Sequence, residues 1–394
     1  MADGAGTILR ETLRIRLRAL GFDAVRFARA EPAFGDGLNA WLSDGNQADM
    51  TWLERGAAKR GDPALVLPGV RTIIMLGVNY GMADEPAEAT PRWARYAQYS
   101  DYHDTIAAAL VEAGAVLEEV GGIGPADHRH YVDTGPLLER GWAARAGLGF
   151  TGKNAMLISR EFGNWLFLAC VLTRLDLPPD APLPGKPPEA TGTHAGQLCG
   201  KCTRCIDACP TNAFTAPGVI DARLCVSYQT IENKGIIPRE LRAGIGNRIY
   251  GCDTCLEVCP WNRFAQASRE ILVTARPEIA RLSLAEVLEL TPASFAVIFK
   301  KTAVKRVKLA GLLRNACIVA GNIGASECVE ALAELAATGV PLVRAHAVWA
   351  LARLGQRERL QALFSAETDS AVLAEYAAEN LCAGADMSAR AVIS

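Results

Sequence analysis

Eight of the chain's twelve cysteines lie between Cys199 and Cys259, and this density constrains the fold more than any other feature. Thiols so close together serve disulfides, zinc or iron–sulfur clusters. The segment at residues 1–22 has the pattern of an amphipathic helix with arginines on its polar face rather than that of a signal peptide. A cytoplasmic protein is therefore expected, where disulfides are rare. The sequence predicts metal-ligating thiols.

The first cysteine motif, Cys199–Pro210, has the spacing C-x2-C-x2-C-x3-C-P, which is typical of ferredoxins that hold 4Fe–4S clusters. In that pattern three thiolates bind one cluster and the fourth binds a second. A second motif, Cys252–Pro260, is one cysteine short, and Cys225 can fill the vacancy by subtraction. The predicted ligand sets are Cys199, Cys202, Cys205 and Cys259 for one cluster, and Cys209, Cys225, Cys252 and Cys255 for the other.

Zinc is the alternative partner for these thiols. Zinc sites also use C-x2-C pairs, but usually as two well-separated pairs around one ion. Three cysteines at x2 spacing, a following x3-C-P and a total of eight thiols fit zinc poorly. The other four cysteines lie in apolar patterns and are predicted to be buried core thiols; they are Cys170, Cys317, Cys328 and Cys382.

The sequence before the cysteines alternates helical and strand patterns, which predicts an α/β domain. Apolar runs at 72–78 and 165–172 predict buried strands, and the patterns at 7–20 and 105–117 predict helices. The proline-rich stretch 177–188 predicts a linker. We therefore expect an α+β multidomain chain with an α/β domain at 1–188, a ferredoxin-like domain at 189–268 and a helical domain at 269–394.

The helical domain contains an internal similarity. Residues 314–324 and 344–355 resemble each other at a spacing of 30 residues, and 374–380 is a weaker third copy. A period near 30 with paired helices is typical of HEAT-like solenoids.

The charge pattern indicates one candidate nucleic-acid contact. Net charge is −2, so overall charge gives no sign of a nucleic-acid partner, yet no acidic residue occurs between Leu290 and Ser326. Such a segment can supply phosphate contacts or can simply be a solvated helix face. Its basic residues are Lys300, Lys301, Lys305, Arg306, Lys308 and Arg314. No apolar run is long enough to span a bilayer, and no membrane association is expected.

Asp133 is the candidate acid. It follows the apparent strand end at Tyr131–Val132 and precedes a turn at Thr134–Pro136. It would thus lie at the carboxyl end of a strand, where sites in α/β folds tend to open. A carboxylate there can be a general acid if burial raises its pKa, and its alternative role is to cap a helix beginning near Pro136. Gly147, Gly149 and Gly152 would let a flat ligand approach the backbone. A second polar cluster, at 96–104, suits a ligand pocket, although His103 and Tyr102 could equally be core or capping groups. The residues alone do not identify a second cofactor.

The chain resembles the epoxyqueuosine reductases, the cobalamin-dependent iron–sulfur enzymes of queuosine biosynthesis in tRNA. The resemblance runs over nearly the whole length and includes both cysteine motifs. Its other motifs are Arg60–Pro63, Arg95–Ala97, Asp101–His103, Val132–Pro136, Gly149–Asn154, Cys225–Tyr228, Tyr250–Asp253, Cys259–Asn262 and Arg314–Asn315. Some members carry cysteine where Ala97 stands, so a thiol there cannot be essential in this protein.

The resemblance implies a cobalamin in the α/β domain, which would be related to the corrinoid core of reductive dehalogenases, and two 4Fe–4S clusters that pass electrons to it. The implied substrate is tRNA carrying epoxyqueuosine at the wobble position, Asp133 is the implied proton donor, and the basic segment is a candidate tRNA contact. We also expect an external electron donor and a cytoplasmic monomer. The predicted cofactor contacts are Arg60, Tyr96, His103, Lys153, Asn154 and Ser227.

Two other functions fit parts of the sequence. A dehalogenase-like corrinoid reductase acting on a small molecule would need neither the helical tail nor the basic segment. A ferredoxin-like electron carrier would not need the α/β domain with its candidate acid.

Overall fold

The computed structural model describes residues 2–31, 35–81, 91–183 and 195–381 and divides the chain into two compact units. The first unit comprises residues 1–86, 99–225 and 253–276; the second comprises 87–98, 226–252 and 277–394. The three-domain division stays a prediction, and each unit is described by itself. No helix in the described ranges is both long and apolar enough to cross a membrane.

The first unit is built on a four-stranded sheet with the order β1-β2-β7-β4. Its strands are β1 (Ala24–Arg29), β2 (Thr72–Asn79), β7 (Leu166–Thr173) and β4 (His128–Val132). The two apolar runs that predicted strands form the two central strands, β2 and β7. Every residue of β2 is buried. Each neighbouring pair is antiparallel. The tendency of sites to open at the carboxyl ends of strands in α/β folds belongs to parallel sheets and does not apply to this antiparallel one. Asp133 does follow a strand, the edge strand β4.

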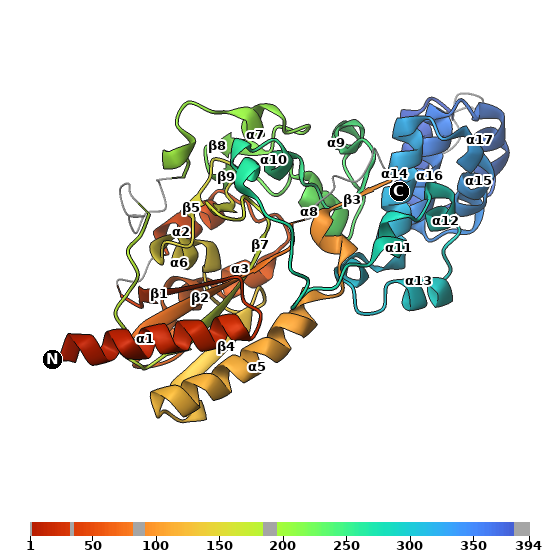
Figure 1. Ribbon diagram of the computed structural model, residues 1–394. Helices are drawn as coiled ribbons and strands as arrows, with labels where there is room; N and C mark the ends of the chain where they lie inside the picture. The colour runs from red at the N-terminus through yellow and green to blue at the C-terminus, as the bar shows by residue number, and fades with distance from the viewer. Residues whose placement is uncertain (1, 32–34, 82–90, 184–194, 382–394) are drawn as a thin grey trace. The chain divides into compact units, whose positions relative to one another are not determined.

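Helices α1 (Ala2–Ala19) and α5 (Tyr102–Gly121) pack against each other and lie on the same side of this sheet (Figure 1). Asp101 caps α5 by accepting a hydrogen bond from the His103 backbone N–H, and Gly122, with φ +63°, ends it. Helix α6 (Glu139–Arg145) packs against β2 and β7. Both predicted helices are confirmed, and each is longer than its sequence pattern indicated.

Short elements complete the first unit. Trp41, on α2, donates a hydrogen bond to the Ile220 carbonyl in the cysteine-bearing part of the unit at 2.7 Å. The short elements are α2 (Asp36–Ser43), α3 (Thr51–Arg55), α4 (Ala57–Gly61), β5 (Phe150–Thr151), β6 (Leu157–Ile158), α7 (Arg204–Asp207), β8 (Phe214–Ala216), β9 (Val219–Ile220) and α10 (Thr254–Glu257).

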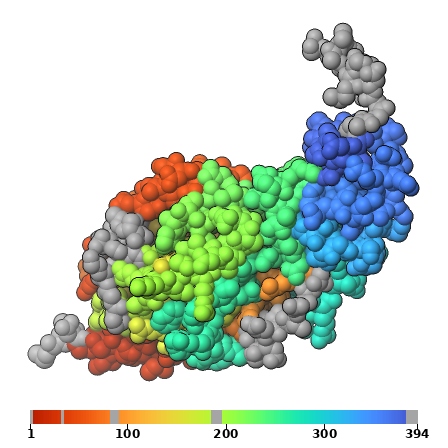
Figure 2. All heavy atoms as spheres, turned by 90° about the horizontal axis from the view of Figure 1, so that it is seen from above, coloured from red at the N-terminus to blue at the C-terminus, as the bar shows by residue number. Residues whose placement is uncertain are grey.

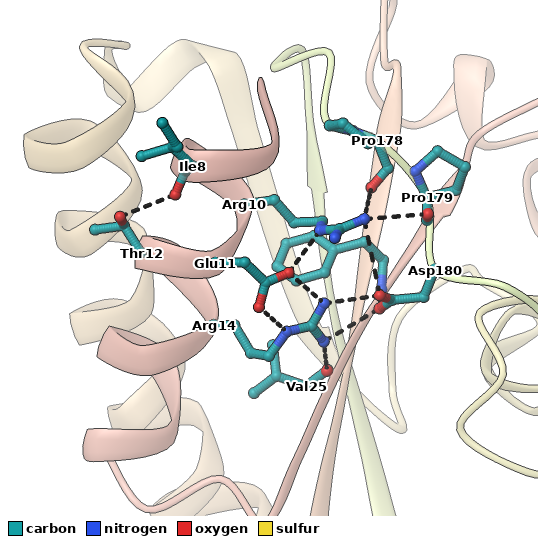
Figure 3. A network of polar contacts seen from close by, with 10 residues as sticks. Ile8, Arg10, Glu11, Thr12, Arg14, Val25, Pro178, Pro179 and Asp180 are labelled. Carbon is teal, nitrogen blue, oxygen red and sulfur yellow. Dashed lines mark hydrogen bonds and ion pairs between the residues drawn. The ribbon is translucent and has the colours of Figure 1, made fainter. Parts of the chain in front are cut away.

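The start of the proline-rich stretch is bound to α1 and β1 rather than free (Figure 3). The Asp180 carboxylate accepts hydrogen bonds from the Arg14 guanidinium at 2.7 and 3.1 Å and from the Phe27 backbone N–H at 2.9 Å. Arg10 donates to the Pro178 carbonyl. The Asp180 side chain is 9% exposed, so these contacts lie in a partly desolvated place. The remainder of the predicted linker, from residue 184, lies outside the described residues.

The second unit is mostly helical, as predicted. Its carboxyl-terminal helices alternate so that α16 packs against α14, α15 and α18. The three sequence copies fall on α14, α16 and α18, which makes them successive helices of one layer. The elements of this unit are β3 (Arg92–Trp93), α8 (Val226–Ile231), α9 (Arg239–Ile245), β10 (Arg248–Tyr250), α11 (Pro277–Ala280), α12 (Leu284–Leu288), α13 (Pro292–Ile298), α14 (Lys308–Ile323), α15 (Val329–Thr338), α16 (Pro341–Arg353), α17 (Arg357–Phe364) and α18 (Ser370–Ala378).

We predict that Asp180→Ala lowers the free energy of unfolding by about 2–4 kcal/mol, because it leaves a partly buried guanidinium and a backbone N–H without their acceptor. Asp176→Ala is the control. Its carboxylate is 49% exposed and pairs with two exposed arginines, so its loss should cost less than about 1 kcal/mol. Urea denaturation of both variants measures the difference, and equal midpoints would contradict the prediction.

Candidate active site and iron–sulfur module

Asp133 occupies a strained turn directly after β4. Its φ is +55°, and the Thr134 N–H donates to the Val132 carbonyl at 2.5 Å, which closes a three-residue turn around it. A side-chain-bearing residue in this form of turn costs about 1–3 kcal/mol and persists where surrounding contacts hold it. The carboxylate is 60% exposed and accessible to a ligand. The burial that would raise its pKa is therefore not observed.

Two side chains from the start of α5 donate to one oxygen of this carboxylate. The Tyr102 hydroxyl lies 3.0 Å and His103 Nε2 lies 3.2 Å from Asp133 Oδ2. The alternative role for Asp133, capping a helix near Pro136, is wrong, since α6 begins at Glu139 and Leu138 occupies the cap position. The structure thus brings the predicted acid and the predicted polar cluster together.

His103 lies between two carboxylates. Its Nδ1 is 2.7 Å from Asp101 Oδ1, while its Nε2 contacts Asp133. Burial disfavours the imidazolium, but the hydrogen bonds to Asp101 and Asp133 outweigh it and raise the pKa of His103 to about 9. Hydrogen bonding to His103 lowers the pKa of Asp101. At neutral pH His103 is therefore a cation.

Tyr102 holds the histidine ring in place by stacking. The centroid of its ring lies 4.1 Å from the centroid of the His103 ring and 4.1 Å from that of the Phe167 ring of β7. Burial, followed by the charge of Asp133, raises the pKa of Tyr102, so its hydroxyl stays a hydrogen-bond donor.

Glu139 and Arg60 fix the backbone of the Asp133 turn. Glu139 Oε1 accepts from the Asp133 N–H at 3.0 Å, and burial together with the Asp133 charge raises the pKa of Glu139 to about 8. Arg60 Nη1 donates to the Gly135 carbonyl at 3.2 Å. A Cβ at Gly135 would lie 2.4 Å from the Tyr131 side chain, so the turn requires glycine there. Sequence reasoning missed Glu139, whose only signal is its position at the start of the next helix.

Lys153 and Asn154, predicted to contact a cofactor, join the sheet-bearing part of the unit to the cysteine module. Lys153 Nζ donates to the Gly200 carbonyl at 2.8 Å. Asn154 is 1% exposed and donates to Asn164 Oδ1 at 2.9 Å and to the Cys255 carbonyl at 3.3 Å. Their cofactor contact stays a prediction, and the structure shows a second role for both.

Asn262 completes this chain of amides. Its Oδ1 accepts from the backbone N–H and the side-chain amide of Asn164, at 3.1 and 2.9 Å, and its own amide donates to the Leu256 carbonyl at 2.7 Å. Both cysteine motifs are thereby attached to the loop that ends at Asn154. The role of Asn164 was not predicted, because it lies outside every recognised motif.

The three glycines predicted to admit a flat ligand have another explanation. A Cβ at Gly147 would lie 2.3 Å from the Ala181 carbonyl oxygen. At Gly149 and Gly152 it would lie 2.4 Å from Ile158 atoms. Protein atoms fill the place of each missing side chain, so close packing accounts for these glycines.

The thiols of the first predicted set lie near one another. Burial raises the pKa of Cys205 to about 11, and the nearby thiols of Cys199 and Cys259 add to this effect. Burial likewise raises the pKa of Cys199, which also senses Cys259 and Cys202. Cys259 of the second motif therefore lies near the cysteines of the first motif. In Figure 2 the segment around residues 195–225, in light green, lies on the face shown.

The second set is described less fully. Cys209 Sγ accepts a hydrogen bond from the Ala213 N–H at 3.3 Å, and Cys252 is the last residue of its segment in the second unit. Within the described ranges, no three His, Cys, Asp or Glu side chains converge on a single metal ion. Both complete ligand sets stay predictions. Three of the predicted core thiols, Cys170, Cys317 and Cys328, are buried as expected; Cys382 lies outside the described residues.

Comparisons with known proteins match three regions. Residues 60–134 match the model described as epoxyqueuosine reductase QueG, DUF1730. Residues 198–262 match the 4Fe-4S double cluster binding domain, and residues 311–382 match HEAT repeats. The last two matches agree with the predicted ferredoxin-like and solenoid regions.

An epoxyqueuosine reductase of Vibrio cholerae is 38% identical over 327 residues, which cover 81% of this chain and 83% of that protein. That of Escherichia coli K12 is 33% identical over 351 residues, 88% of each. The chain belongs to the epoxyqueuosine reductase family. A crystal structure of an epoxyqueuosine reductase with an epoxyqueuosine-modified tRNA-Tyr stem loop matches with TM-score 0.81 and 30% identity, covering 95% of this chain and 98% of that one. The Streptococcus thermophilus enzyme matches with TM-score 0.82 and 28% identity over the same shares.

In this reductase two predicted cofactor contacts belong to the second unit. The Tyr96 ring lies 6.1 Å from the Tyr250 ring. Ser227 lies on α8, where its carbonyl accepts from the Thr230 hydroxyl at 3.4 Å. Their contact with a cofactor stays a prediction.

The basic segment divides into surface and core residues. Lys300, Lys301, Lys305, Arg306 and Lys308 are exposed. Arg314, in contrast, is 0% exposed and donates to the backbone carbonyls of Gln229, Asn233 and Gly235 at 2.7–2.9 Å. The prediction of a phosphate contact is therefore wrong for Arg314. Composition could not separate it from its neighbours, because only the packing of α14 places it inside.

We predict that Arg314→Met destabilises the reductase by about 3 kcal/mol or more, since one buried and two partly buried hydrogen bonds to backbone carbonyls are lost at once. Lys305→Met removes a charge from the same segment at an exposed position and should change stability by less than about 0.5 kcal/mol. Thermal unfolding of the two variants compares them. Similar melting temperatures would show that Arg314 is not a structural residue.

Proposed function

We propose that this protein reduces epoxyqueuosine to queuosine at the wobble position of tRNA, using two 4Fe–4S clusters and a cobalamin. The observation that carries the proposal is the exposed Asp133 carboxylate, hydrogen-bonded to Tyr102 and His103, in a member of the epoxyqueuosine reductase family with an eight-cysteine module. The family membership supports the reaction, and the site supports the proton chemistry it requires.

The reaction removes the epoxide oxygen as water. Epoxyqueuosine, two electrons and two protons give queuosine and water, so the protein must deliver both electrons and protons to one place. Asp133 is the proposed donor to the departing oxygen. Tyr102 and His103 orient its carboxylate, while Glu139 and Arg60 hold the backbone that presents it.

The donor set fits two iron–sulfur clusters. Thiolates are the usual ligands of 4Fe–4S clusters, and eight cysteines supply two sets of four. The proposed sets are Cys199, Cys202, Cys205 and Cys259, and Cys209, Cys225, Cys252 and Cys255. An external reductant would charge these clusters, which then pass electrons on.

Cobalamin is proposed from the family resemblance, and the site has one feature that fits it. Arg60 Nε, beside the Asp133 turn, is buried and has no hydrogen-bond partner among the described residues, so it can bind a polar group of a large cofactor. When bound, cobalamin supplies the two-electron chemistry at the epoxide carbon. The residues proposed to hold it are Arg60, Tyr96, His103, Lys153, Asn154 and Ser227.

The tRNA contact is proposed for the exposed part of the basic segment. Lys301 and Lys308 have φ of +53° and +63°, in a region that side-chain-bearing residues rarely adopt. Strained backbone tends to persist where function needs it, and both strained residues here are lysines. We propose that the five exposed basic residues bind phosphates of the anticodon stem loop.

We predict that purified, anaerobically reconstituted protein converts epoxyqueuosine to queuosine in a modified stem loop, and that Asp133→Asn lowers kcat at least about 100-fold because an amide cannot donate the required proton. Asp104→Asn, at an exposed position of α5, is the control and should retain activity. Nucleoside analysis of the RNA measures both. Full turnover by Asp133→Asn would remove Asp133 as donor.

We further predict that the double variant Lys305→Gln/Lys308→Gln weakens stem-loop binding and flattens its salt dependence. Each lost phosphate contact should reduce the slope of log affinity against log salt by about 0.7–0.9. Arg16→Gln, an exposed cation on α1, is the control and should leave the slope unchanged. Binding titrations at several salt concentrations test this; an unaltered slope in the double variant would place the phosphate contacts elsewhere.

A further inference from the structure

The proposed reaction needs more protons than its donor holds. The epoxide oxygen leaves as water and so takes up two protons, whereas a carboxyl group carries one at a time. A second proton must therefore reach the departing oxygen within each turnover. The inference below rests on the proposed function and concerns the source of the second proton.

His103 is placed to recharge Asp133. Its Nε2 lies 3.2 Å from Asp133 Oδ2, within reach of a direct proton transfer. On the other side of the ring, Asp101 Oδ1 accepts a hydrogen bond from His103 Nδ1 at 2.7 Å. Asp101 also accepts from the His103 backbone N–H at 3.1 Å, so it fixes both the main chain and the ring of this residue. With Nδ1–H bound to Asp101, the proton that can leave is the one on Nε2.

We propose that Asp101, His103 and Asp133 form a proton relay in which His103 recharges Asp133 during each reduction. In the transfer the N–H bond at His103 Nε2 breaks and an O–H bond forms at Asp133 Oδ2. Asp133 then gives this proton to the departing oxygen, and the two electrons come from the iron–sulfur clusters. His103, whose side chain is 30% exposed, regains its proton from solvent.

The surroundings of His103 favour a stored proton. The titratable groups around it are Asp101, Tyr102, Asp133 and, behind Asp133, Glu139. Asp101 precedes α5, Tyr102 lies on α5, Asp133 follows β4 and Glu139 lies on α6. The Phe167 ring of β7 packs against Tyr102 and does not titrate. The two carboxylates that contact the imidazole outweigh its burial, and a pKa of about 9 keeps it charged at neutral pH. Both ring nitrogens of His103 already contact carboxylates. A cofactor could therefore contact His103 only through the carbon atoms of its ring.

Direct recharging from bulk water is the competing route. Asp133 is 60% exposed in the protein alone, so water reaches it before substrate binds. A bound nucleoside would cover that face, whereas His103 contacts Asp133 from α5 and can transfer its proton without a water molecule reaching Asp133. The two routes differ in what happens when Asp101 or His103 is changed.

The test combines imidazole titration with kinetics. Histidine NMR signals of the wild-type protein, assigned by their loss in His103→Gln, should show His103 titrating near pH 9. In Asp101→Asn its midpoint should fall, because a carboxylate that raises the pKa is gone. The alkaline limb of the kcat–pH profile should move down with that midpoint, while KM for the stem loop stays within about twofold.

Chemical rescue supplies a second measurement. His103→Ala should lose at least about tenfold in kcat. Added imidazolium ions should restore activity, and the more acidic ones should restore more at equal concentration, as expected of a proton donor rather than of cavity filling. His130→Gln, at a half-buried histidine on β4, is the control and should keep the wild-type profile. An alkaline limb unmoved in Asp101→Asn, or no rescue, overturns the relay while leaving the reductase function intact. A wild-type protein that makes no queuosine overturns the proposed function and the relay with it.

Discussion

The chain of amides Asn154–Asn164–Asn262, in which Asn154 and Asn164 are buried and Asn262 is partly buried, is the interaction on which the rest of the first unit depends. It connects the loop after α6 with the second cysteine motif, and Lys153 connects the same loop with the first. Hydrogen bonds between buried amides are directional and costly to leave unpaired, so the chain fixes the cysteine module against the sheet. A module that must deliver electrons to a site on that sheet needs such an attachment, because a tether of prolines alone would leave the distance undefined.

The proton-handling site depends on a different kind of constraint. Asp133 is held in a strained turn by Glu139, which accepts from its backbone N–H, and by Tyr102 and His103, which contact its carboxylate. Arg60 holds the same turn by donating to the Gly135 carbonyl. The strain is maintained because four groups on three elements oppose its release. The result is a carboxylate that faces solvent yet has one defined orientation and a charged neighbour.

Much of the organisation could be predicted, because some residues carry their structural meaning locally. The spacing of the cysteines indicated a double-cluster domain, and the apolar runs became the central strands β2 and β7. The 30-residue similarity became the helices α14, α16 and α18. In each case a short pattern needs only its own chemistry, thiolate ligation or an uninterrupted apolar surface, to specify the outcome.

The errors share a physical cause, which is that tertiary packing decides the environment of a side chain. Arg314 was grouped with surface lysines, although α14 turns it into the core. Asp133 was placed at the carboxyl end of a strand, where burial could make it a general acid, whereas it follows an antiparallel edge strand, is 60% exposed and contacts Tyr102 and His103 of α5. No local pattern reports which distant residue will lie 3 Å away.

The most direct test of the account is the nucleoside content of tRNA in a bacterial strain that lacks its own epoxyqueuosine reductase and expresses this chain. The account predicts that queuosine replaces the accumulated epoxyqueuosine, and that the chain with Cys202→Ala leaves epoxyqueuosine in place. Persistent epoxyqueuosine in cells that contain the folded, cluster-loaded wild-type protein would contradict it.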